Sequence, residues 1–316
     1  MPKWAWYLKR ALVDGGHEVD HHCWADYPAW RKHDHLPEPE QARLLSSYLA
    51  EVLHIERGRA ERAVPLEYEH IIADGFWACG LPDGAPATVV CHGTWAGLAA
   101  ACGGVDPELI AAQGEAYRRF PVVAVSQAAA RQVERYHGAR VAEIIANGVD
   151  LRVFRAAERR PQDPPVVLYA GRGYAKGEDV VREVARRFDG AVIIEYLDAA
   201  MGMEARAYQR GDVFLHPSRH EGDSYAVKEA LACGLPVVAS AVGALEDERS
   251  GEIGETVQGF EAADYCAALE RVLANSGAYQ PRRWAERHAG FEAFAEQWVR
   301  YLGAATQTVC RRGKAI

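Results

Sequence analysis

Short apolar runs that alternate with amphipathic segments, on both sides of one proline-rich stretch, constrain the fold of this sequence most. Each run is rich in valine, isoleucine and leucine and is followed by small or polar residues, which is typical of buried parallel strands. The intervening segments repeat their apolar residues at helical spacing. Strands that alternate with helices in this way predict doubly wound α/β domains built on parallel sheets.

The proline-rich stretch, residues 150–165 (DLRVFRAAERRPQDPP), is polar and basic and ends in prolines, as an interdomain linker does. We therefore predict one α/β domain over residues 1–149 and a second over residues 166–290. The last segment, residues 291–316, is predicted to be a helix and tail that cross back to the first domain. Ligands bind beyond the carboxyl ends of strands in such sheets, so we expect the site in a central cleft between two facing domains.

The predicted strands are Val19–Trp24, Ile71–Ala73, Thr88–Cys91, Pro121–Val125, Val141–Ala146, Val166–Ala170, Ala191–Tyr196, Val213–His216 and Val237–Ser240. The predicted helices are Pro2–Val13, Gln41–Val52, one that Ser126 caps and that runs to His137, Glu178–Phe188, Met203–Arg210, Tyr225–Cys233, Ala262–Ala274 and Phe291–Tyr301. Glycines and prolines end several of these segments, as they commonly end helices and strands.

Composition and charge exclude several classes of protein. A net charge of -8 argues against a general nucleic-acid binder, which needs excess lysine and arginine to displace counterions. The apolar runs are too short to span a bilayer, although contact with a membrane surface stays open. The sequence starts without an apolar signal segment, and its seven cysteines are dispersed without a C-x-x-C pair. We therefore expect reduced thiols, a cytoplasmic location and no bound metal.

The segment Asp212–Ser240 (DVFLHPSRHEGDSYAVKEALACGLPVVAS) holds the densest group of candidate site residues. A buried strand leads to a polar loop with Glu221, and Ser224 is predicted to cap a helix that carries Glu229. The first carboxylate can reach a ligand at the loop, and the second can reach one beside the start of the helix. The helix N-terminus adds unpaired N–H groups and a positive dipole end, which suit an anion or sugar hydroxyls.

The E-x7-E pair in this segment resembles the motif of the retaining GT-B glycosyltransferases, in particular family 4. Three other segments resemble the same family in the same order: GHEV at Gly16–Val19, IIANGVD at Ile144–Asp150 and YAGRGYAKGED at Tyr169–Asp179. The resemblance covers nearly the whole chain and is weakest over residues 25–67. It implies two Rossmann-like domains, an acceptor-side one and a nucleotide-sugar-binding one, and transfer of a sugar from a nucleoside-diphosphate sugar.

The resemblance also implies roles for single residues. Glu229 would hold the ribose hydroxyls of the nucleotide, and Glu221 would face the donor sugar near the reacting centre. The other donor-binding positions would be Gly171, Gly222, Asp223, Ser224 and Tyr225, the last three through backbone N–H groups. Asp223 and Ser224 replace the family's usual aromatic residue and glycine, which hints at an uncommon donor sugar.

Arg172 and Lys176 are the predicted partners of the donor diphosphate. The reaction leaves a nucleoside diphosphate with new negative charge, and two cations can neutralise that charge at a gain on the order of 3 kcal/mol. The sequence contains no D-x-D of the kind that holds a divalent ion, so we expect metal-independent chemistry with the nucleotide sugar as substrate and no further cofactor. His92, directly after the predicted strand Thr88–Cys91, matches a family histidine that touches the donor sugar.

The retaining outcome likewise comes from the resemblance, because spacing cannot reveal stereochemistry. No residue stands out as a glycosyl nucleophile, which fits a front-face reaction in which the leaving phosphate helps to deprotonate the acceptor. Family members begin with a strand before their first helix, whereas this sequence starts at that helix. We therefore expect the reading frame to begin upstream or another segment to fill the position of that strand.

Two other classes of function stay open. One is a GT-B nucleotide-sugar epimerase or phosphorylase-like enzyme, and the other is a non-catalytic homologue that binds a nucleotide sugar. A transferase hydrolyses its donor slowly even without acceptor, whereas a binding protein releases no nucleotide. The acceptor, whether glycan, lipid or small molecule, the base and the donor sugar are not predicted.

Overall fold

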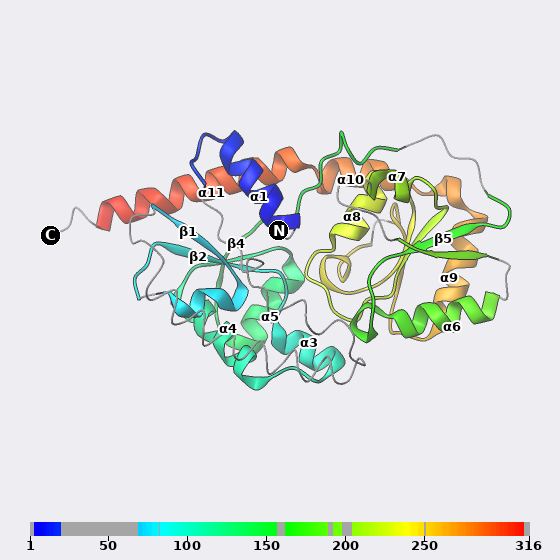
Figure 1. Ribbon diagram of the computed structural model, residues 1–316, viewed down its shortest axis with the longest axis horizontal. Helices are drawn as coiled ribbons and strands as arrows, with labels where there is room; N and C mark the ends of the chain where they lie inside the picture. The colour runs from blue at the N-terminus through cyan, green and yellow to red at the C-terminus, as the bar shows by residue number, and fades with distance from the viewer. Residues whose placement is uncertain are drawn as a thin grey trace, which may run out of the picture. The chain divides into compact units, whose positions relative to one another are not determined.

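A computed structural model describes residues 3–19, 69–81, 83–156, 162–188, 192–197, 204–249 and 251–312 (Figure 1). The predicted strand Val19–Trp24 and helix Gln41–Val52 lie outside these residues except for Val19. The chain divides into two compact units. Unit 1 comprises Met1–Ile145 and Ala295–Ile316, and unit 2 comprises Ala146–Phe294.

Unit 1 holds a parallel sheet of four strands in the order β1-β2-β3-β4 among its described residues. The strands are β1 (Ile71–Asp74), β2 (Ala87–Cys91), β3 (Val122–Ala124) and β4 (Val141–Ile144). Both central strands are buried along their whole length, which explains their continuously apolar sequences. The helices that complete this unit are α1 (Lys3–Asp14), α3 (Trp95–Cys102), α4 (Pro107–Arg119), α5 (Gln127–His137) and the part of α11 (Phe291–Arg312) from Ala295 onward.

Helix start signals account for α5 and also for two helices that the sequence analysis does not predict. The Ser126 hydroxyl accepts a hydrogen bond from the Ala129 N–H at 3.1 Å, as predicted. Thr94 caps α3 and Asp106 caps α4 through the same kind of side-chain contact. Helix α3 has a nearly uniform apolar sequence, so it lacks the periodicity that would reveal a helix.

In the part of unit 2 that the structure describes, five parallel strands form a sheet in the order β6-β5-β7-β8-β9. The strands are β5 (Val166–Tyr169), β6 (Ile193–Tyr196), β7 (Val213–His216), β8 (Val237–Ser240) and β9 (Gly254–Val257). The helices among its described residues are η4 (Tyr174–Lys176), α6 (Glu178–Phe188), α7 (Glu204–Tyr208), α8 (Tyr225–Ala232), η5 (Gly243–Leu245), α9 (Ala262–Ala274), η6 (Ser276–Ala278), α10 (Pro281–His288) and the first turn of α11. The sequence analysis does not predict β9 and α10, whose sequences are largely polar.

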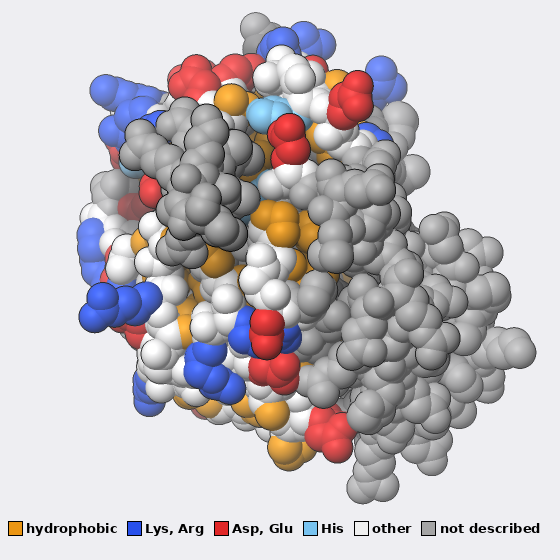
Figure 2. Space-filling view, turned by 90° about the vertical axis from the view of Figure 1, so that its left-hand side faces the viewer, with side chains coloured by type: hydrophobic (Ala, Val, Ile, Leu, Met, Phe, Trp, Pro, Cys, Tyr) orange, Lys and Arg blue, Asp and Glu red, His pale blue; other side chains and the backbone are white. Residues whose placement is uncertain are grey.

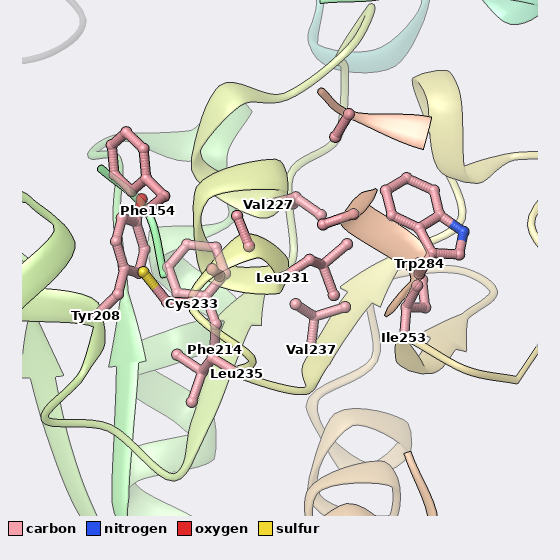
Figure 3. Packing of buried hydrophobic residues seen from close by; sticks show 14 of the residues in the cluster. Phe154, Tyr208, Phe214, Val227, Leu231, Cys233, Leu235, Val237, Ile253 and Trp284 are labelled. Atoms are coloured by element: carbon pink, nitrogen blue, oxygen red, sulfur yellow. The ribbon is translucent and has the colours of Figure 1, made fainter. Parts of the chain in front are cut away.

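Both faces of this sheet are covered by buried apolar side chains. Phe214 and Val237 point into the cluster around α8, part of which is drawn in Figure 3. Their neighbours Leu215 and Val238 belong instead to a second cluster, around α6 and α9. Successive side chains of a strand point to opposite faces, so burial on both faces demands the continuous apolar runs seen in the sequence.

The surface is mixed in charge. On the face shown in Figure 2, the described acidic and basic side chains are interspersed with one another. None of the helices in the described part of the chain is both long enough and apolar enough to cross a membrane.

Gly177 allows a close approach that orders the loop after β5. Its φ is +72°, and a Cβ there would lie 2.1 Å from the carbonyl oxygen of Pro217. Gly259 has a similar φ of +83° but nothing within 4 Å of the same position. Gly259→Ala should therefore lower the free energy of unfolding by only about 1–2 kcal/mol, the cost of the left-handed backbone.

Gly177→Ala should lower the free energy of unfolding by at least about 2 kcal/mol more, because the loop must move away from Pro217. Chemical denaturation of both variants beside the wild type measures the difference. Equal losses in the two variants would contradict the close packing of this loop.

Candidate functional site

The loops that follow β5 and β7 meet at the carboxyl edge of the unit 2 sheet. The two strands are direct neighbours, so the segments after them lie side by side. Arg219, buried after β7, forms a two-bond ion pair with Asp179 at 2.7 Å and donates to the carbonyl oxygen of Tyr174 at 2.7 Å. These contacts connect the two loops, and they bring Lys176 close to the loop that carries Glu221.

Two basic side chains contact the carboxylate of Glu221. The Lys176 ammonium donates a hydrogen bond to Glu221 Oε1 at 2.6 Å, and His216 Nε2 lies 3.2 Å from the same oxygen. Burial alone would raise the pKa of Glu221, but His216 and Lys176 hold this pKa well below its usual value. Glu221 is therefore ionised at neutral pH and accepts hydrogen bonds without donating any.

Two glycines shape the main chain around this ion pair. A Cβ on Gly171, whose φ is +98°, would lie 2.9 Å from Cγ of Lys176, so glycine leaves room for the lysine stem. A Cβ on Gly243 would lie 2.7 Å from the carbonyl oxygen of Glu221. The Ala244 N–H also donates to the carbonyl oxygen of Gly222 at 2.8 Å. The backbone of the Glu221 loop is thus held against the segment that follows β8.

A small pocket that opens to solvent lies beside Glu221. It is lined by His216, Glu221, Asp223, Ser224, Val227, Lys228, Ser240, Val242, Ala244, Leu245 and Trp284. Charged groups gather at the start of α8, and Trp284 and Leu245 give the pocket an apolar side. A few convergent polar groups beside apolar walls are typical of small-molecule sites.

The start of α8 differs from the prediction in one respect. Ser224 occupies the N-cap position with an extended backbone, but its side chain makes no capping hydrogen bond. The predicted capping contact is therefore wrong, although Ser224 does occupy the predicted N-cap position. The first N–H groups of a helix have no hydrogen-bond partner within the helix. The Ser224 side chain does not supply such a partner here. Gly222 precedes this turn and Tyr225 begins the helix.

Asp223 is held by its side chain and by its carbonyl group. Its Oδ2 accepts hydrogen bonds from the backbone N–H of Asn147 at 2.7 Å and from the Lys228 ammonium at 2.5 Å. Its carbonyl oxygen accepts one from the Asn147 side-chain amide at 2.9 Å. The sequence analysis assigned no role to Lys228 or Asn147, although a lysine within the apolar stretch YAVKEALA signals a buried charge.

The remaining predicted donor-site residues occupy the same edge of the sheet or the body of α8. Glu229 is buried on α8, where it accepts a hydrogen bond from the Tyr208 hydroxyl at 3.1 Å. The Arg172 guanidinium lies over the ring of Tyr196, 4.5 Å from its centroid, at the end of β6. The structure thus joins Lys176 with Glu221, whereas the Arg172 side chain, from the same loop as Lys176, lies against Tyr196 of the neighbouring strand β6.

His92 belongs to a separate cluster in unit 1. It directly follows β2, and Asp74 ends the adjacent β1, with Asp74 Oδ1 lying 4.0 Å from His92 Nε2. The Trp4 ring lies 4.5 Å from the His92 ring, so this tryptophan faces the same edge of the sheet. Burial raises the pKa of Asp74, while His92 and a hydrogen bond from Trp4 oppose that rise.

The chain has two α/β units, each built on a parallel sheet, and charged loops gather at the strand ends of the second unit. This architecture defines a two-domain transferase fold of the GT-B class. Sucrose-phosphate synthase from Thermosynechococcus elongatus aligns with a TM-score of 0.68 and 19% identity, covering 86% of this chain and 81% of that one. HepE from Anabaena, solved with UDP and glucose, aligns with a TM-score of 0.61 and 17% identity over 83% of this chain and 82% of its own. The chain therefore has the GT-B fold.

Sequence comparison gives the family. The model described as "Glycosyltransferase Family 4" matches residues 2–153, and the model described as "Glycosyl transferases group 1" matches residues 140–275. The two models together match residues 2–275, and this supports a group 1 glycosyltransferase of the GT-B type (family 4).

Relatives within the family are similar over part of their length. D-inositol 3-phosphate glycosyltransferase from Geodermatophilus obscurus is 32% identical over 245 residues, which cover 59% of this chain and 53% of that protein. The protein of the same name from Mycobacterium tuberculosis is 32% identical over 205 residues, covering 51% and 43%. The chain thus spans about half the length of the curated relatives it matches.

The depressed pKa of Glu221 predicts how its contribution to stability depends on pH. A carboxyl whose pKa falls on folding stabilises the protein above its unfolded pKa of about 4.3, and this contribution is lost as the pH falls. Glu221→Gln should therefore lower the free energy of unfolding at pH 7 by about 2 kcal/mol, the scale of hydrogen bonds to a charged group. The difference from wild type should shrink steadily below about pH 4.3.

Urea denaturation at several pH values measures this difference, with Glu270→Gln on the exposed face of α9 as the control. A gap between Glu221→Gln and wild type that stays constant down to acid pH would contradict an ionised, doubly paired Glu221.

Proposed function

We propose that this protein transfers a sugar from a nucleoside-diphosphate sugar to a hydroxyl group of an acceptor and binds the donor in unit 2. The Lys176–Glu221 ion pair beside the start of α8 carries the proposal, because it sets a cation and a hydrogen-bond acceptor side by side at a pocket. Family membership and the HepE structures with UDP and with UDP-glucose support it.

Lys176 and the N-terminus of α8 suit the donor diphosphate. The lysine brings a mobile positive charge, and the helix brings N–H groups and the positive end of its dipole. Arg172, on the same loop as Lys176, adds a second cation near the end of β6. We propose that these groups neutralise the charge that develops on the leaving diphosphate, without a metal ion.

Glu221 and Glu229 suit hydroxyl groups. An ionised carboxylate only accepts hydrogen bonds, so Glu221 fits the hydroxyls of a donor sugar and does not fit the role of a general acid. Glu229 is a second acceptor, oriented by the Tyr208 hydroxyl at 3.1 Å, and we assign it to the ribose. His92, Asp74 and Trp4 form a polar and aromatic group in unit 1 that suits a polyhydroxyl ligand.

The proposed reaction retains the anomeric configuration. The anomeric C–O bond to the diphosphate breaks, a bond to the acceptor oxygen forms on the same face, and the acceptor proton passes to the leaving phosphate.

The names of the relatives make an inositol phosphate the first acceptor to test. The dispersed cysteines of the sequence, which form no C-x-x-C pair, support action in the reducing cytoplasm.

A nucleotide panel tests the donor site. UDP, GDP, ADP, TDP and CDP are compared by the thermal shift they produce, and we expect UDP to give the largest. A ligand at about 100 times its dissociation constant stabilises the protein by roughly 2.7 kcal/mol. Glu229→Gln should lose most of this shift because it removes the charged acceptor for the ribose.

Glu261→Gln, an exposed glutamate before α9, should keep the full shift and serves as the matched control. If no diphosphate raises the melting temperature of the wild type, or if Glu229→Gln responds like wild type, the donor site is not where we place it.

Removal of metal tests the metal-independent mechanism. Release of UDP from UDP-glucose, by slow hydrolysis or by transfer to an inositol phosphate, should proceed at the same rate after dialysis against EDTA, because Lys176 and the helix N-terminus supply the positive charge. A rate that collapses in EDTA and returns with Mg²⁺ or Mn²⁺ would sink this part of the proposal.

A further inference from the structure

We propose that Lys228 and Asn147 are positioning residues of the donor site. Together with Asp223 they form a buried charge clamp (Asn147, Asp223 and Lys228) that fixes the peptide group before α8 and so sets the affinity for the β-phosphate and sugar of the donor. The inference rests on the proposed function, since it assumes that this pocket takes a nucleotide sugar.

The charged side chains of the charge clamp are almost completely buried. The side chains of Asp223 and Lys228 are only 1% and 4% exposed, and their charged atoms lie 2.5 Å apart. The Lys228 ammonium also donates to the carbonyl oxygen of Asn147 at 2.7 Å. The Asn147 N–H donates to Asp223 Oδ2 at 2.7 Å, so each of the three residues contacts the other two.

Stability alone does not explain such a pair. Two charges lose their hydration when they are buried, and well-packed neutral side chains in their place are often as stable or more stable. Removal of only one partner is different, because it leaves an uncompensated charge in the interior. We therefore infer that this buried ion pair at the edge of the pocket serves to hold the neighbouring backbone in one geometry.

The geometry that the charge clamp controls is the peptide between Asp223 and Ser224. The Asn147 side-chain amide holds the carbonyl oxygen of Asp223 at 2.9 Å. In a planar trans peptide the N–H points opposite to the carbonyl, so the Ser224 N–H is turned away from Asn147. Asp223 and Ser224 both line the pocket, where this N–H becomes available to a phosphate or sugar oxygen.

Asn147 is a firm anchor because its own segment is fixed within unit 2. The Val149 N–H donates to the carbonyl oxygen of Ala289 at 2.8 Å, and the Phe291 N–H donates to that of Val149 at 3.0 Å. A Cβ on Gly148 would lie 2.6 Å from Cβ of Phe294, so this segment packs closely on the start of α11.

The proposal predicts which part of the donor is affected. The charge clamp acts on the loop before α8, whereas Glu229 and Tyr208 lie on α8 and α7 and are assigned to the ribose. Loss of the clamp should therefore weaken binding of UDP-glucose and leave binding of UMP nearly unchanged. A purely structural defect would not separate the two ligands.

The experiment compares Lys228→Met, Asp223→Asn and the double variant Asp223→Asn/Lys228→Met with wild type by calorimetric titration of UDP-glucose and UMP. The double variant removes both charges, so it should recover folding stability that Lys228→Met loses. We expect it to bind UDP-glucose about tenfold more weakly, as the loss of one well-placed hydrogen bond does, and to bind UMP like wild type.

Wild-type affinity for UDP-glucose in the folded double variant would overturn the proposal, and so would equal losses for both ligands. A wild-type protein that binds neither ligand would instead overturn the proposed function, and the charge clamp proposal with it. The double variant keeps the test decisive even where Lys228→Met does not fold.

Discussion

The largely buried, ionised carboxylate of Glu221 is the group on which the second unit depends. A charge mostly removed from water needs partners, and Lys176 and His216 supply them from the loop after β5 and from the end of β7. Gly243, after β8, presses against the main chain of the same residue. Three neighbouring strands of one parallel sheet are thus tied together at the edge where such sheets bind ligands.

A second buried carboxylate complements the first. Glu221 and Asp223 flank Gly222, and their side chains are held by different parts of unit 2: one by the strand ends, the other by Asn147 and Lys228. A loop pinned on both sides of a glycine presents its backbone in one geometry. Such preorganised N–H groups are what the binding and stabilisation of a diphosphate require.

Much of the fold can be predicted from the sequence because burial on both faces leaves a strong apolar signal. β7 and β8 have the predicted bounds, and so do α6 and α9, whose apolar residues recur at helical spacing. β9 and α10 lack such a signal, since their sequences are polar. The motif around Glu221 marks the site, but the contacts of Lys228 with Asn147 join residues 81 positions apart, which no local pattern reveals.

The central claim is that the pocket beside Glu221 is the donor site, and a crystal structure of the protein with UDP tests it most directly. The account predicts the diphosphate between the Lys176 ammonium and the first turn of α8, with the ribose hydroxyls on Glu229. UDP bound elsewhere in the protein, with the Lys176–Glu221 pair untouched and the ribose hydroxyls away from Glu229, would contradict it.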